Sequence, residues 1–149
     1  MLSLEEISDR LEIQQLLIDY STAIDRRRFD DLDRVFTPDA HIDYSAFGGI
    51  VGTYPEVKAW LAEILPNFPV YAHMLGNTDI RVDGDAASSR TICFNPMVLP
   101  GAAGPATSKS GEKPQVMFCG LWYVDEFVRT PEGWRMARRV EEKCFDKVI

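Results

Sequence analysis

The chain has 149 residues, of which 46% are hydrophobic and 26% charged, with a net charge of −7 and a pI near 4.8. This composition is typical of one globular domain, and we expect a single domain over residues 1–149. The acidic balance argues against nucleic acids and anionic membranes as partners, since both require a basic surface. Because neither a membrane-spanning run of about 20 apolar residues nor a signal segment is evident, we expect a cytoplasmic protein.

The first predicted element is a long N-terminal helix. Ser3 and Glu6 form the pattern of a capping box, in which each side chain bonds the other residue's backbone amide. Helical spacing then predicts an apolar face that ends in a carboxylate at Asp25. The residues expected on this face are Ile7, Leu11, Leu17, Ile18, Tyr20 and Ile24.

Shorter elements follow in residues 26–65. We expect a short helix at 29–36 that runs to Pro38, a strand at 40–47, a loop at 48–54, and a helix that begins with Pro55. Three cysteines (Cys93, Cys119 and Cys144) are widely spaced and form no CxxC pair, so buried free thiols are expected rather than a zinc site or disulfides.

The second half of the chain alternates with a period of two. Strands are predicted near 70–82, 86–98, 115–129 and 133–145, with turns at 83–85 and 131–133. Residues 100–114 are small, polar and rich in glycine and proline, which is typical of a lid or a disordered loop. Helices followed by antiparallel strands predict an α+β fold with the helices on one face of a curved sheet, whose concave interior suits a small ligand.

One histidine lies in an unusual apolar setting, the string "YAHMLGN" at residues 71–77. Alternation places apolar residues on both sides of the strand, so His73 is expected to be dehydrated and to need a partner for its N–H. Asp25, at the end of the helix face, is the candidate. A carboxylate in this role fixes the imidazole tautomer and leaves the other ring nitrogen free to accept a proton. The alternatives are a core histidine with a structural partner and a surface aspartate.

Four strings, taken in order, resemble the SnoaL-like, scytalone dehydratase-like family of the nuclear transport factor 2-like superfamily. They are "IQQLLIDYSTAIDRRRFDDLDRVFTPDA" (13–40), "HIDYSAFGG" (41–49), "AHMLGNTDIRVDGDAA" (72–87) and "YVDEFVRTPEGWRMARR" (123–139). The resemblance implies a cone-shaped α+β barrel, in which a curved mixed or antiparallel sheet wraps around N-terminal helices and encloses a deep pocket.

The resemblance also implies roles for individual residues. In the family's dehydratases and dehydrochlorinases an aspartate after the first helix pairs with a strand histidine, and these positions match Asp25 and His73. Tyrosines of two family dehydratases match Tyr20 and Tyr44, which could hydrogen-bond a substrate carbonyl or its enolate. The chain departs from scytalone dehydratase at Met97, where that enzyme has a second histidine.

The predicted pocket is therefore more apolar than that of scytalone dehydratase. It is expected to include Phe94, Asn95, Met97 and Trp122, whereas Arg138, Arg139 and Lys143 are expected to be solvated. No metal ligand cluster or nucleotide motif is present, so no metal and no cofactor are expected.

These patterns lead to one main functional hypothesis and two alternatives. The main hypothesis is a cofactor-independent lyase that performs a dehydratase-type β-elimination on a small, cyclic, mostly apolar substrate. The alternatives are an isomerase or polyketide-cyclase-type enzyme with the same base, and a non-catalytic small-molecule-binding module. A homo-oligomer, either a dimer or a trimer, is expected from the family.

Overall fold

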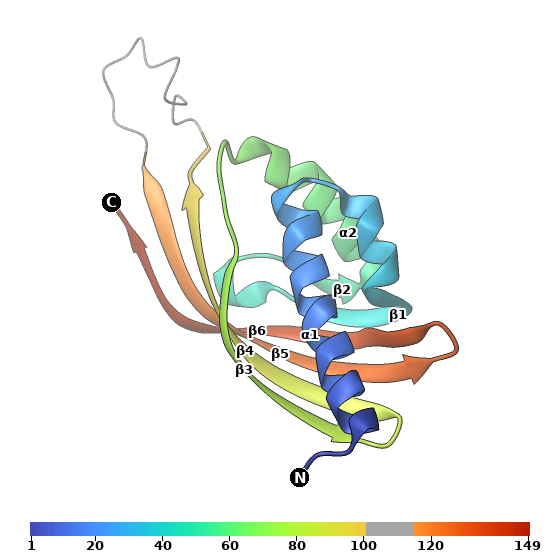
Figure 1. Cartoon of the computed structure of the whole chain (residues 1–149). Helices are drawn as coiled ribbons and strands as arrows, with labels where there is room; N and C mark the ends of the chain where they lie inside the picture. Colours follow the sequence, from blue (N-terminus) through green and yellow to red (C-terminus); the bar gives the residue numbers. More distant parts are fainter. Residues whose placement is uncertain (101–114) are drawn as a thin grey trace.

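The computed structural model describes residues 1–100 and 115–149 (Figure 1). The loop predicted at 100–114 therefore lies outside the described residues apart from Pro100. The helices are α1 (Leu4–Asp25) and α2 (Tyr54–Ile64), with three short 3-10 helices: η1 (Phe29–Arg34), η2 (Ser45–Phe47) and η3 (Leu65–Asn67). The strands are β1 (Phe36–Asp43), β2 (Val51–Thr53), β3 (Met74–Asp83), β4 (Ala86–Val98), β5 (Val116–Thr130) and β6 (Gly133–Val148).

The six strands form one curved sheet in the order β2-β1-β6-β5-β4-β3. Strands β1 and β6 are parallel and the other neighbours are antiparallel, so the sheet is mixed. Both α-helices lie on the concave side of the sheet (Figure 1). The expected α+β fold, with a curved sheet around the N-terminal helices, is confirmed. The hydrophobic core fills the space between the helices and this concave face.

Helix α1 begins as predicted but buries a different face. The Ser3 hydroxyl accepts a hydrogen bond from the amide of Glu6, while the Glu6 carboxylate binds Arg10 rather than closing the capping box. The buried apolar residues are Ile13, Leu16, Leu17, Tyr20, Ala23 and Ile24. The predicted face members Ile7, Leu11 and Ile18 are exposed by 41%, 60% and 46%. That part of the prediction is wrong, because apolar residues occur around the whole helix and periodicity alone does not identify the packed side.

The segment between the two α-helices also differs from the prediction. The helix expected to reach Pro38 ends at Arg34, and β1 includes Pro38. Proline donates no ladder hydrogen bond, and the pairing of β1 with β6 is irregular between Phe36 and His41. Tyr44 follows β1 rather than lying within it, and the predicted loop at 48–54 contains β2, which pairs with β1.

The two hairpins of the second half form where they were predicted. Gly84 and Gly133 have positive φ values of 60° and 103°, a conformation in which glycine is not strained, and they lie at the β3–β4 and β5–β6 turns. Strand β3 begins at Met74, so His73 lies immediately before it rather than inside it. Met74 is 50% exposed and Val70 is 54% exposed. One side of this segment therefore faces solvent, and only the His73 side faces the core.

A buried carboxylate fastens α1 to the β5–β6 hairpin. The Asp9 carboxylate accepts hydrogen bonds from both Nη atoms of Arg129, at 2.8 and 2.9 Å, and from the indole Nε1 of Trp134 at 3.0 Å. Asp9 is 4% exposed. The hydrogen bonds from Arg129 and Trp134 lower the pKa of Asp9.

Replacement of Asp9 by alanine is expected to lower the free energy of unfolding by about 1–3 kcal/mol at neutral pH, because the buried Trp134 N–H loses its acceptor. Since the pKa of Asp9 is lower in the folded state, its stabilising effect is present above the carboxylate's usual pKa and is lost as the pH falls. Urea unfolding should therefore show a smaller difference from wild type in acid. Asp19→Ala, on the exposed side of the same helix, is the control; equal effects of both substitutions would contradict this account.

Candidate active site

His73 and Asp25 form a close pair at the end of α1. The His73 Nδ1 lies 2.7 Å from Asp25 Oδ1, and the His73 backbone amide donates to the same carboxylate, 3.0 Å from Oδ2. The His73 side chain is 6% exposed and the Asp25 side chain 29%. Because a carboxylate only accepts hydrogen bonds, Nδ1 carries the hydrogen in the neutral ring. The free lone pair is then on Nε2.

The Nε2 atom lies on the cavity side of the ring, next to Asn95. Asn95 Nδ2 is 3.3 Å from His73 Nε2, and its Oδ1 is buried without a hydrogen-bond partner among the described residues. The 3.3 Å contact is long for a hydrogen bond. Asn95 therefore fixes the ring only weakly from this side, and a substrate group could replace it at Nε2.

His73 and Asn95 line a cavity of about 360 Å³ between the helices and the concave face of the sheet. Leu61, Ile64, Leu65, Phe68 and other apolar side chains form most of its wall. The lining residues whose side chains carry an oxygen or an ionisable nitrogen are Tyr20, Tyr44, His73, Asn95, Tyr123 and Glu141. The site is thus a mostly apolar chamber with a few polar groups, as small-ligand sites generally are.

Tyr20 from α1 and Tyr44, just after β1, meet inside this chamber. Their hydroxyl oxygens are 2.7 Å apart, and both side chains are buried. Burial raises the pKa of Tyr20 to about 12 and the pKa of Tyr44 well above its usual range, so both phenols are protonated at neutral pH. Whichever phenol donates in this bond, the other keeps a hydrogen that it can offer to a ligand. The pair can therefore act as a hydrogen-bond donor to a substrate oxygen.

A fully buried ion pair supports the tyrosines from the sheet. The Arg139 guanidinium donates two hydrogen bonds to Asp125, at 2.7 and 2.8 Å, and both side chains are 0% exposed. Its central carbon lies 4.1 Å from the Tyr20 ring centre and 3.9 Å from that of Tyr123. The prediction that Arg139 is solvated is wrong. The register between β5 and β6 shifts by one residue, because Glu126 pairs with Arg138 whereas Phe127 pairs with Met136. The extra residue in β6 forms a bulge that turns Arg139 inward.

The same shift turns Glu141 toward the cavity. Glu141 pairs with Tyr123 across the β5–β6 ladder and lines the chamber. Burial raises its pKa to about 8, with Arg139 lowering it and Asp43 raising it further. Sequence reasoning missed this residue, because the run "RRVEEK" resembles a solvated charged edge. The β5–β6 pairing places Glu141 opposite Tyr123, but this register can be derived from the sequence only if the bulge in β6 is already known.

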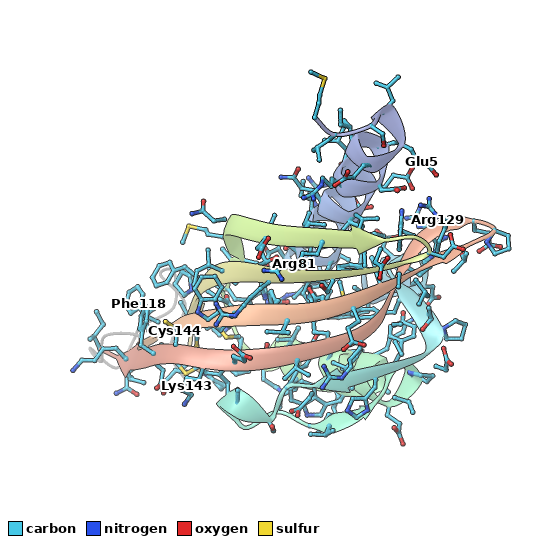
Figure 2. All side chains as sticks on the ribbon, turned by 90° about the horizontal axis from the view of Figure 1, so that it is seen from below. Glu5, Arg81, Phe118, Arg129, Lys143 and Cys144 are labelled. Carbon is cyan, nitrogen blue, oxygen red and sulfur yellow. The ribbon has the colours of Figure 1, made fainter. Side chains whose placement is uncertain are left out.

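The four residues predicted to line the pocket fall on two faces of β4 and β5. Asn95 and Met97 line the chamber, but Phe94 and Trp122 do not. Phe94 stacks on Phe118, and Arg90 covers the Trp122 ring at 3.9 Å. Figure 2 shows this outer face, with Phe118 labelled near the ends of the strands. The pocket prediction for Phe94 and Trp122 is wrong, because side chains alternate along a strand and theirs share the face opposite Asn95.

Two further properties concern only the part of the chain that the structure describes. Residues 1–100 and 115–149 contain no group of three or more His, Cys, Asp or Glu side chains that could hold a metal ion. Within the same residues, no helix is both long and apolar enough to span a membrane.

Comparisons with known proteins agree with this architecture. The chain is 68% identical over its full length to an uncharacterized protein of Mycobacterium tuberculosis, covering 95% of that protein. Its fold resembles the Kfla4162 protein of Kribbella flavida, with a TM-score of 0.82, 24% identity and 95% coverage of both chains. It also resembles a hexachlorocyclohexane dehydrochlorinase of Novosphingobium barchaimii, with a TM-score of 0.79, 18% identity, and coverage of 98% of this chain and 93% of that one. The model of the SnoaL-like domain matches residues 5–140. The chain therefore belongs to the SnoaL-like domain family.

Proposed function

We propose that this protein is a cofactor-independent lyase that removes a proton from the carbon next to a carbonyl group and expels a leaving group from the β-carbon. The observation that carries this proposal is the contact between His73 Nδ1 and Asp25, which leaves Nε2 available on the cavity side. A positioned histidine base contributes typically 10²–10⁴-fold to a rate.

The chemistry of the base follows from its two neighbours. Asp25 accepts the hydrogen of Nδ1, so Nε2 can take the substrate proton, and the carboxylate then stabilises the imidazolium. The mostly apolar wall lowers the local polarity around the reacting atoms, which strengthens this charge interaction. The proton passes from carbon to Nε2, and its electron pair moves into the carbonyl to form an enolate.

The paired phenols of Tyr20 and Tyr44 receive the negative charge of that enolate. Because they are already hydrogen-bonded to each other at 2.7 Å, little reorganisation is needed when charge develops on the substrate oxygen. Collapse of the enolate forms the carbon–carbon double bond and breaks the bond to the leaving group. A cavity of about 360 Å³ with mostly apolar walls favours a small, cyclic, largely apolar substrate.

The comparisons support the reaction class without identifying the substrate. The name of the Novosphingobium barchaimii neighbour denotes elimination of a chloride and a proton from a small ring. The same apolar chamber could accept such a ring. Three further expectations stay predictions. They are the absence of a metal or organic cofactor, a cytoplasmic location, and assembly into a homodimer or homotrimer.

Proton abstraction can be measured before the natural substrate is known. Cyclic β-hydroxy ketones, β-chloro ketones and enones are incubated with the protein in deuterated water, and NMR follows deuterium entry at the α-carbon. The proposal predicts exchange or elimination that depends on His73. Ligands that bind in the chamber without any exchange would instead indicate a binding module, and double-bond migration without loss of a group would indicate an isomerase.

Replacement of Tyr44 by phenylalanine is expected to lower kcat by roughly 10²-fold, because removing one donor to a developing oxyanion has an effect of this size. KM should change much less, since the donor acts mainly on the transition state. Steady-state kinetics on a reactive ketone of the panel checks this. Tyr54→Phe is the control, because its hydroxyl binds Asp33 outside the chamber; an equal loss of kcat in both variants would count against the role of Tyr44.

A further inference from the structure

The chamber contains a second ionisable group that the base does not use. Glu141 lies on β6, opposite Tyr123 of β5, and lines the same cavity as His73, which reaches it from the segment before β3. In the sheet order, β5 and β4 separate β6 from β3. The carboxyl group and the imidazole therefore reach one cavity from different parts of the sheet, as an acid and a base on one substrate require.

Among residues 1–100 and 115–149, no side chain forms a hydrogen bond or an ion pair with the Glu141 carboxyl group. The cation beside it on the same strand, Arg139, directs two of its nitrogens to Asp125 instead. Burial opposes the negative charge of Glu141 most strongly, Arg139 partly offsets this effect, and the nearby Asp43 adds to it. The pKa of Glu141 is raised to about 8, so the group is largely a carboxylic acid at neutral pH. A protonated carboxyl in a mostly apolar chamber is suited to donate its hydrogen to an oxygen.

We propose that Glu141 is the general acid that protonates the leaving oxygen, and that the protein's substrate is accordingly a β-hydroxy ketone. This inference rests on the proposed function. Nε2 of His73 takes the α-proton to leave the enolate, and collapse of the enolate forms the double bond and breaks the C–O bond. Glu141 transfers its proton to the departing oxygen, so that water leaves. The imidazolium and the Glu141 carboxylate then return to their starting states by exchange of one proton with solvent.

Hydroxide is a poor leaving group, whereas chloride departs without a proton. The test therefore compares 3-hydroxycyclohexanone with 3-chlorocyclohexanone in the wild type and in Glu141→Gln, which keeps the side chain's size. We expect the substitution to lower kcat for the hydroxy ketone by about 10²-fold or more and to leave kcat for the chloro ketone within about threefold. Glu142→Gln, the exposed neighbour that pairs with Arg90, is the control and should change neither rate.

Deuterium exchange at the α-carbon separates the inference from the proposed function. Glu141→Gln should keep this exchange, because His73 is intact, while His73→Ala should lose it. Exchange and chloride loss in the wild type, together with unchanged water loss in Glu141→Gln, would overturn the inference and leave the base standing. Absence of both exchange and elimination for both ketones in the wild type would overturn the function and the inference together.

The pH profile of the wild type gives a second test that needs no variant. Water loss should decline as the pH rises through about 8, where Glu141 ionises, and chloride loss should lack this decline. The other titratable and charged groups around the chamber come from four parts of the fold. They are Asp43, Arg139 and Lys143 on the β1 and β6 side, Asp125, Tyr123 and Cys119 on β5, Tyr20 with Tyr44, and His73 with Asp25 at the end of α1. Only Glu141 should separate the two leaving groups. An identical alkaline limb for both ketones would contradict its role.

A spectroscopic readout is independent of any substrate. Infrared difference spectra of wild type minus Glu141→Gln at neutral pH should contain the C=O band of a protonated carboxylic acid, which should disappear in alkali. A carboxylate band in its place at neutral pH would overturn the proposal.

Discussion

Replacement of His73 by alanine is expected to lower kcat for any substrate of this protein by about 10²–10⁴-fold and to abolish deuterium exchange at the α-carbon, because Nε2 is the proposed proton acceptor. Asp25→Asn should be nearly as severe. An amide nitrogen at this position would donate to His73 Nδ1, which would move the ring hydrogen to Nε2 and remove the lone pair from the cavity. The oxygen of the new amide side chain could still accept the His73 backbone N–H, so the fold should survive.

The matched control for this experiment is the protein's other histidine. His41→Ala removes an exposed ring on β1 and should leave both the exchange rate and kcat unchanged. Thermal unfolding of each variant checks that loss of activity is not loss of the folded state. Full turnover in His73→Ala or in Asp25→Asn would refute the proposed base.

Replacement of Arg139 by methionine is expected to destabilise the fold by about 3–5 kcal/mol, because it leaves the Asp125 carboxylate buried without its partner. The double variant, with Asp125→Leu added, should recover much of this loss, since an apolar pair of similar volume avoids the unpaired charge. Urea unfolding at neutral pH measures all three proteins. Arg138→Met is the control, because the Arg138 side chain is 42% exposed. Its one ion pair among the described residues is a weak surface contact, with 3.6 Å between Arg138 Nη1 and Glu126 Oε1.

The pH dependence of the single variant follows from the remaining acid. Burial raises the pKa of Asp125 even with Arg139 present, and loss of the cation should raise it further. A group with a raised folded-state pKa binds protons more readily when folded, so stability increases as the pH falls through that pKa. The difference in the free energy of unfolding between wild type and Arg139→Met should therefore become smaller in acid. A difference that becomes larger in acid would contradict the proposed effect of the unpaired Asp125 carboxylate. Equal stability of Arg139→Met and of the double variant with Asp125→Leu would contradict it as well.

The sequence was most informative where local rules determine the structure. The hairpin turns at Gly84 and Gly133 and the period-two strands around them were predictable from turn chemistry and alternation. The meeting of Asp25 with His73 was suggested by burial logic and by the resemblance, and the structure brings the two side chains together. The two residues could be paired across the chain because Asp25 ends the predicted inward face of the first helix and His73 lies in a mostly apolar segment that offers its ring no partner.

The errors have physical causes that a single sequence does not reveal. Helix α1 carries apolar residues on every side, so only its packing against the sheet distinguishes buried Ile13 from exposed Leu11. On β6, the extra residue at the bulge reverses the alternation, which places Arg139 and Glu141 inside although a regular strand would place Arg138 there. A bulge is set by tertiary pairing rather than by local propensity. The wrong assignment of Phe94 arose because aromatic character does not reveal which face of a strand is enclosed.

The central claim is that Asp25 holds the His73 ring so that Nε2 is free inside the mostly apolar chamber. The most direct measurement is the nitrogen NMR spectrum of protein labelled with ¹⁵N-histidine, with exposed His41 as the internal reference. The account predicts that His73 has a hydrogen fixed on Nδ1 and none on Nε2 in its neutral form, and that Asp25→Asn removes this preference. Ring nitrogens of His73 that are averaged like those of His41, or a hydrogen fixed on Nε2, would contradict it.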